Sequence, residues 1–143
     1  MANVVVNKFK VESMRGNINL SADNEIKVAL LDNIFGLSST DQLSDVTSWN
    51  SLSADWEASG DNYVVGGKYL SAVNIYQDNI NNRAQMSAAN VVWELSTISA
   101  YGVIVYREND GLPICFIDFG IIKTSIVSDF VVQWSGGTVL NLT

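Results

Sequence analysis

Residues 100–134 read AYGVIVYRENDGLPICFIDFGIIKTSIVSDFVVQW, and this stretch decides the fold class. It contains three apolar runs rich in β-branched and aromatic residues, a composition that favours half-buried strands. The turn Glu108–Gly111 separates the first two runs, because its Asp-Gly pair supplies the positive-φ residues that a tight hairpin needs. The stretch therefore predicts an antiparallel meander whose core-facing residues include Val103, Val105, Ile114, Phe116, Ile126, Phe130 and Val132.

Strand patterns recur through the rest of the chain. The total of about eight or nine short strands, separated by turn residues, is typical of a sandwich or a barrel. We therefore expect a mainly β, single-domain antiparallel β-sandwich or barrel over residues 1–143, with a short N-terminal helix. The predicted strands outside the meander lie within Gly16–Leu20, Glu25–Asp32, Tyr63–Tyr76 (kinked at Gly66–Gly67), Arg83–Leu95 and Val139–Leu142.

The first residues allow two interpretations. Val4–Met14 fits a short helix, because several apolar residues fall near one helical face and Arg15 and Gly16 supply a basic last turn and a stop. The run Val4–Val6 instead favours an extended N-terminal arm. Both interpretations stay open from the sequence alone.

The segment Asn33–Ser59 is rich in Ser, Asp, Asn and Thr, and its apolar residues recur at three- or four-residue spacing. This spacing predicts one or two short helical turns. A loop of this length in a compact domain is usually functional or packs against the rest of the chain. Its residues Trp49 and Trp56 therefore either pack within the domain or contact a partner.

The chain is acidic, with 15 Asp and Glu against 8 Lys and Arg, so its formal net charge is −7. Nucleic-acid binding is therefore disfavoured, because contact with phosphates needs a local excess of cations. The sequence shows neither a signal-peptide pattern nor an apolar run of the roughly 18 residues that suggests a membrane span. We expect synthesis in a cytoplasm, in soluble form, and no membrane partner.

Few residues are suited to catalysis or metal binding. The sequence has no His and one Cys, Cys115, which lies in an apolar run and is expected to be buried. Without His or a second Cys, a zinc site is not expected. Carboxylates lie close in sequence at Asp41 and Asp45 and at Asp55 and Glu57, but without calcium-loop spacing, so we expect a solvated surface there. The sequence predicts a protein that is not an enzyme and holds no cofactor or metal.

Short segments along nearly the whole chain are similar to a group of small virion proteins of tailed bacteriophages. No single motif is specific, and the resemblance depends on their order and on the chain length. The segment 33–59 departs most from the family pattern. The matching segments are Ala2–Val5, Asn7–Lys10, Ile26–Asp32, Tyr63–Leu70, Ala89–Trp93, Ala100–Tyr106, Ile117–Gly120, Asp129–Trp134 and Leu140–Thr143.

The resemblance implies a structural part of a phage particle. Such proteins are commonly capsid decoration (cement) proteins, so the expected partners are the major capsid protein and the chain itself, as a homotrimer on the capsid surface. A head–tail adaptor or minor tail protein is one alternative, and a carbohydrate-binding module for host attachment is another. The residues expected to contact a partner are Val4, Val5, Val6, Phe9, Trp49 and Trp56.

Overall fold

The computed structural model describes residues 3–21, 25–32 and 43–143. These residues form a mainly β structure with antiparallel sheets in a sandwich-like arrangement that does not close into a barrel. The predicted fold class, including the short N-terminal helix, is confirmed. Of the two architectures that the sequence left open, the structure has the sandwich-like one.

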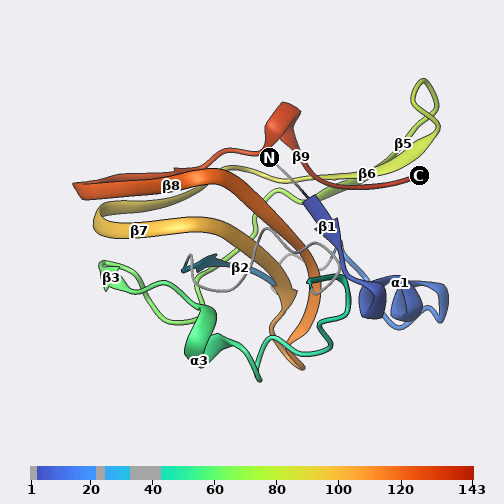
Figure 1. Cartoon of the computed structure of the whole chain (residues 1–143). Helices are drawn as coiled ribbons and strands as arrows, with labels where there is room; N and C mark the ends of the chain where they lie inside the picture. The colour runs from blue at the N-terminus through green and yellow to red at the C-terminus, as the bar shows by residue number, and fades with distance from the viewer. Residues whose placement is uncertain (1–2, 22–24, 33–42) are drawn as a thin grey trace.

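Two sheets hold the described strands (Figure 1). The larger has the order β1-β8-β7-β2-β4, with β3 also on β7, and consists of β1 (Asn3–Val5), β2 (Ile26–Leu31), β3 (Gly60–Asp61), β4 (Lys68–Tyr69), β7 (Val91–Arg107) and β8 (Leu112–Val132). The smaller has the order β5-β6-β9 and consists of β5 (Asn74–Asp78), β6 (Arg83–Ser87) and β9 (Thr138–Leu142). The helical segments are α1 (Asn7–Met14), α3 (Ser53–Trp56) and the 3-10 turn η2 (Ser135–Gly137).

The long hairpin of β7 and β8 is the centre of the fold. Its turn lies where the sequence predicts it, with Arg107 paired to Leu112 across the Asp-Gly pair and Gly111 at φ +69°. The Asp110 carboxylate closes the turn by accepting hydrogen bonds from the Leu112 amide and the Arg107 guanidinium. Consecutive residues Val103–Val105 are all buried, which shows that this part of the hairpin is covered on both faces.

The predicted three-stranded meander over residues 100–134 is wrong in one respect. The second and third apolar runs belong to a single strand, β8, and chain reversal does not occur at Gly120. Instead the chain bulges: Gly102 pairs with Asp118 and Ala100 with Lys123, so β8 has three more residues than β7 in this interval. The Asp118 carboxylate accepts the Gly120 amide at 2.8 Å and Gly120 has φ +82°, which stabilises a bulge within the ladder.

The N-terminus contains both structures that the sequence left open. Asn3–Val5 is extended and pairs antiparallel with Cys115–Ile117 of β8, and α1 follows directly. Phe9 is the buried residue of α1, and Gly16, at φ +75°, follows the helix end as predicted. The extended start and the helix therefore form one continuous segment against β8.

Two other predicted strands differ from the structure. The segment Gly16–Leu20 is not a strand in its described residues, because it lies outside both hydrogen-bonded sheets. The segment Arg83–Leu95 divides into β6 and the start of β7, because the chain passes from the smaller sheet to the larger one at Ala88–Asn90.

The hairpin of β5 and β6 extends away from the body of the molecule (Figure 1). Ile80, in the turn between these strands, is 95% exposed. No described helix is long and apolar enough to cross a lipid bilayer.

Candidate protein-binding surface

Both strands of the central hairpin bend sharply at one end of the molecule, so that the two-stranded ribbon turns back on itself (Figure 1). We call residues 94–98 of β7 and 124–129 of β8 the β7–β8 bend. Leu95 and Val127 each lie at an irregularity of the pairing and have φ of +48° and +45°. A left-handed backbone is unusual for non-glycine residues, especially β-branched ones. The bend therefore depends on side chains that stabilise it.

Two buried hydroxyl groups stabilise the inside of this bend. The Ser96 and Ser125 Oγ atoms are 2.9 Å apart, and both residues are buried. The Ser96 hydroxyl also lies 3.0 Å from the Trp93 carbonyl oxygen, and the Ser125 hydroxyl accepts the Ile98 amide. These bonds satisfy backbone groups where the ladder is interrupted.

The outside of the bend carries aliphatic side chains. Leu95, Ile126 and Val127, which we call the bend cluster, are 63%, 73% and 69% exposed. The sequence predicted Ile126 to be in the core, and this prediction is wrong, because the irregular pairing at Val127 breaks the alternation of inward and outward side chains. Exposed apolar side chains that gather in one place are typical of contact surfaces.

A second exposed aliphatic group lies on the β8 bulge. Ile121 and Ile122, which we call the bulge pair, follow Gly120 and are both exposed. The bulge places these neighbouring residues outside the regular pairing with β7, so the core does not cover them. Among described residues, β1 pairs with β8 only at Cys115–Ile117, and the remaining outer edge of β8 has no strand beside it. An unpaired strand edge with exposed aliphatic residues is suited to contact another protein.

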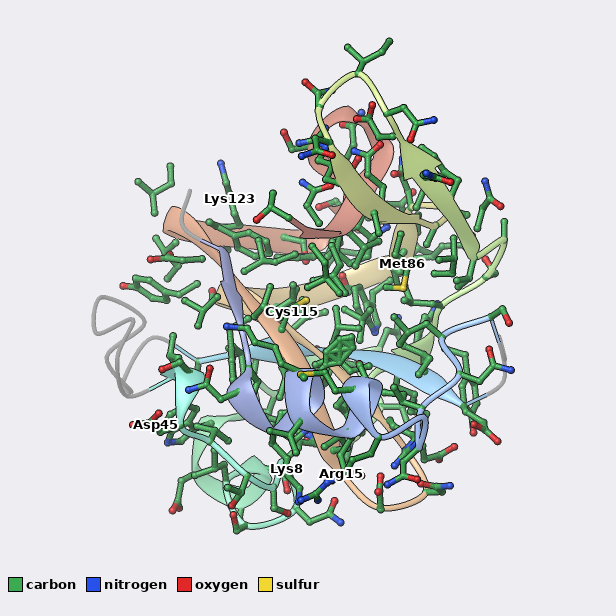
Figure 2. The ribbon with its side chains drawn as sticks, turned by 90° about the vertical axis from the view of Figure 1, so that its right-hand side faces the viewer. Lys8, Arg15, Asp45, Met86, Cys115 and Lys123 are labelled. Atoms are coloured by element: carbon green, nitrogen blue, oxygen red, sulfur yellow. The ribbon has the colours of Figure 1, made fainter. Side chains whose placement is uncertain are left out.

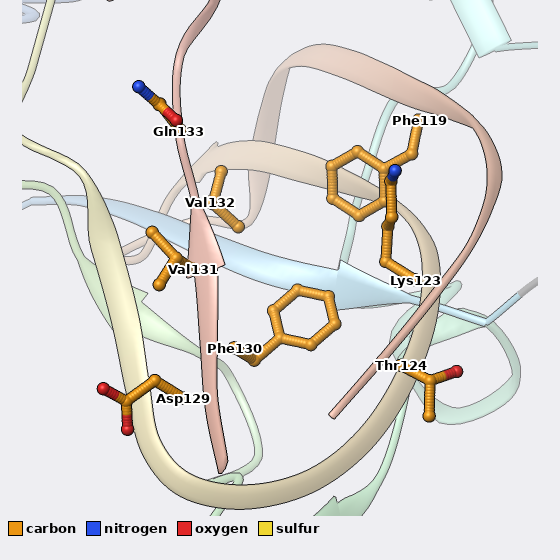
Figure 3. Close-up of a pocket in the computed structure, with 8 residues that line it drawn as sticks. All are labelled: Phe119, Lys123, Thr124, Asp129, Phe130, Val131, Val132 and Gln133. Carbon is orange, nitrogen blue, oxygen red and sulfur yellow. The ribbon is translucent and has the colours of Figure 1, made fainter. Parts of the chain in front are cut away.

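An open groove separates the two arms of β8 on either side of the bend (Figure 3). Its volume is about 530 Å³. Phe119 and Phe130 contribute apolar walls, with ring centroids 6.4 Å apart. Lys123 lies on one arm and Asp129 on the other, and the Asp129 carboxylate accepts the Leu95 amide at 3.2 Å. The groove thus has both apolar and polar walls, with one group of each charge.

The structure places three predicted partner contacts inside the chain itself. Val6, Phe9 and Trp49 are buried in the core, so their side chains are not exposed to a partner in this structure. Val6 donates its amide to the Ile114 carbonyl, and Phe9 belongs to the core side of α1. For Trp49, packing within the domain is the alternative that the structure supports.

The other three predicted contacts are partly buried against the same core. Val4 and Val5 are held in β1 by pairing with β8. Trp56, at the end of α3, lies edge-on to Phe116 with ring centroids 6.2 Å apart. None of the six predicted contacts belongs to the bend cluster or the bulge pair. The signal in the sequence that could have found the bulge pair is the Gly-Ile-Ile run, in which two adjacent isoleucines cannot both face the core of a regular strand.

Two of the carboxylates that lie close together in the sequence, Glu57 and Asp45, accept hydrogen bonds from other parts of the chain. Glu57 accepts hydrogen bonds from the Tyr63 hydroxyl at 2.7 Å and the Gly66 amide at 2.6 Å, which fixes the turn before β4. Asp41 lies outside the described residues, and Asp45 accepts the Asn7 side-chain amide. Among the residues that the structure describes, no three His, Cys, Asp or Glu side chains come together as metal ligands would.

Cys115 is fully enclosed in the middle of the molecule (Figure 2). Burial raises the pKa of its thiol to about 12. Because the thiolate is the reactive form, native Cys115 is expected to react at least about 100-fold more slowly than a free thiol with a disulfide reagent such as DTNB. Absorbance should report one reactive thiol per chain only after unfolding in guanidinium chloride; rapid labelling of the native protein would contradict its burial.

No protein-family model, curated protein or solved structure matches this chain. The resemblance to phage virion proteins therefore stays a prediction from the sequence. The geometry indicates a surface suited to protein contacts, made by the bend cluster and the bulge pair.

Proposed function

We propose that this chain is a structural protein of a bacteriophage particle that binds the outside of the assembled capsid and stabilises it, as a cement protein does. The resemblance of the sequence suggests the class of particle. The observation that carries a protein-binding role is the exposed aliphatic surface of β8. The virion location, the major capsid protein as partner and the homotrimer are part of this proposal.

The bulge pair is the part of this surface that we assign to the capsid. Ile121 and Ile122 are both exposed and lie outside the regular pairing with β7, so a partner protein can bury apolar area of each side chain. Burying aliphatic side chains contributes about 25 cal/mol per Å² of apolar area removed from water. Many copies on one lattice would make such modest contacts effective together.

The charge of the chain supports an external position. With a net charge of −7, the protein would be repelled by packaged DNA, whereas the outer face of a shell presents no such polyanion. A protein that binds only the assembled shell, and not free capsid subunits, stabilises the shell by mass action. We therefore expect this protein to raise the temperature at which particles lose their DNA.

Cryo-electron microscopy of particles that contain this chain tests the location. We expect density for β7 and β8 on the outer capsid surface, with the bulge pair facing the major capsid protein. Density found only in the tail, or as one ring at the vertex where the tail joins, would overturn the cement function and favour a tail component or an adaptor.

Adding purified protein back to shells that lack it tests the contact residues. A variant with Ile121→Asp and Ile122→Asp is expected to bind at least about ten-fold more weakly, because unpaired carboxylates would be buried in the contact. Ile80→Asp is the matched control, since Ile80 is also exposed and aliphatic but lies on the β5–β6 turn. Equal binding by both variants would exclude the bulge pair as the capsid contact.

The carbohydrate-binding alternative rests on Trp49, Trp56 and the tyrosines as an aromatic platform. Trp49 is buried and Trp56 packs partly against the core, so the two tryptophans do not form such a platform, whereas Tyr69 and Tyr76 are exposed.

A further inference from the structure

A second apolar surface lies at the end of the molecule opposite the β7–β8 bend, between α1 and the smaller sheet (Figures 1 and 2). It consists of two adjoining hollows of about 540 and 550 Å³ that share Ser13 and Leu142. We call it the α1 hollow. Its apolar lining includes Val5, Phe9, Met14, Ile18, Leu20, Val73, Ile75 and Leu142.

Side chains of this lining remain uncovered. Met14, at the end of α1, is 90% exposed, and Ile75 of β5 is also exposed. The α1 hollow is a pair of recesses with a mixed apolar and polar lining, whereas the side chains of the bend cluster are exposed at the other end of the molecule. The exposed aliphatic cluster of one copy can therefore enter the recess of another.

The two surfaces also have opposite charge. Among the described residues that line the α1 hollow, the charged side chain is Lys10, and no Asp or Glu side chain takes part. Lys8 and Arg15 of the same helical segment lie within 3.4 Å of Glu12. Lys10 instead donates to the Asn7 side chain, whose amide group donates in turn to the Asp45 carboxylate. The chain has almost twice as many acidic as basic side chains, so a surface whose charged side chain is a lysine is unusual in it.

The charged side chains at the β7–β8 bend have the opposite sign. Its segments, together with β3 paired beside them, carry the carboxylates Glu94, Asp129 and Asp61 and contain no Lys or Arg. Lys123, the nearest cation along β8, lines the groove between the arms together with Asp129, whereas Glu94 and Asp61 do not line it. Charges of opposite sign around two apolar surfaces favour their docking in one orientation.

We propose that copies of this chain associate head to tail, with the bend cluster of one copy in the α1 hollow of the next. Leu95, Ile126 and Val127 supply the apolar contact, and the carboxylates at the bend lie close to Lys10 of the neighbour. Because the two surfaces are different and lie at opposite ends, each copy keeps one surface of each kind available. Contacts of this type are heterologous, and they close into a ring when the rotation between copies permits it.

The oligomeric state of the purified protein tests the contact without any capsid. Light scattering after size-exclusion chromatography should show assemblies larger than one chain at about 1–300 μM, the range in which a micromolar contact is populated. The mass should fall as salt rises, because opposite charges contribute to the contact. A single-chain mass throughout this range would overturn the proposal.

Variants of the two ends distinguish a head-to-tail contact from a symmetric one. Val127→Asp disables the bend cluster, and Met14→Asp disables the α1 hollow; both side chains are exposed, so the fold should persist, as circular dichroism can confirm. Each variant alone should be monomeric, with association at least about ten-fold weaker than in the unmodified chain. Ile80→Asp, on the remote β5–β6 turn, should assemble normally.

A mixture of the two variants gives the decisive result. The intact bend of the Met14→Asp chain can enter the intact hollow of the Val127→Asp chain, so the mixture should form a two-chain complex and nothing larger. A mixture that stays monomeric, or a variant that assembles alone, would overturn the head-to-tail contact. Because no capsid is present, this result and the capsid-binding result can fail separately.

Discussion

Replacing Trp49 by alanine should lower the free energy of unfolding by about 3–5 kcal/mol, the range found when large buried aromatic residues are truncated. Trp49 is 2% exposed, and its ring lies 5.9 Å from that of Tyr106. Its amide donates to the Gly111 carbonyl at 2.8 Å, which joins the 43–56 segment to the central turn. Truncation would leave a cavity at this junction.

Urea unfolding followed by far-ultraviolet circular dichroism measures the loss, since this signal does not depend on the indole that is removed. Ile80→Ala is the control and should change stability by less than about 0.5 kcal/mol, as expected for an exposed site. A Trp49→Ala protein within about 1 kcal/mol of the unmodified chain would contradict core packing and return Trp49 to the candidates for partner contact.

Replacing Gly67 by alanine should cost about 3 kcal/mol or more, because the added methyl group has no room and the backbone conformation is unfavourable. A Cβ atom at this position would lie 1.8 Å from the Val28 carbonyl oxygen and 2.9 Å from the Ala29 Cα. Gly67 has φ +76° and precedes β4, which pairs with β2 through Val28 and Lys68. The clash is therefore with the backbone of a central strand, and β4 would have to move.

The loss expected for Gly67→Ala has two causes, the clash of the added methyl group and the unfavourable backbone conformation, and Gly136→Ala separates them. Gly136 has φ +62°, but a Cβ atom there would meet no other atom within 4 Å. Its substitution should cost only the conformational part, about 1–2 kcal/mol. Thermal unfolding of the two variants side by side measures the difference; equal losses would show that the close approach of Gly67 to β2 has no energetic effect.

Local patterns predicted the regular parts of the fold. The Asp-Gly pair at Asp110 identified the central turn, and the strand pattern within Glu25–Asp32 identified β2. These features succeed because the turn and the strand depend on residues close in sequence. The burial of Cys115 could also be predicted, since its neighbours are apolar.

The candidate surface could not be predicted in the same way. The bend depends on left-handed backbone at Leu95 and Val127, residue types that give no local signal for it. A hydrogen bond between Ser96 and Ser125, 29 positions apart, stabilises this conformation, so it arises only from tertiary structure. The same holds for Trp49, whose burial requires the central turn to be in place.

The pairing of β1 with β8 has a consequence for biosynthesis. Asn3–Val5 bond to Cys115–Ile117, so the first strand has to wait for a partner about 110 residues away. At about 5–20 residues per second the ribosome needs roughly 5 to 20 s to supply it. A nascent chain that has not yet reached Cys115–Ile117 has no partner for Asn3–Val5, so the larger sheet can be completed only after this part of β8 has been synthesised.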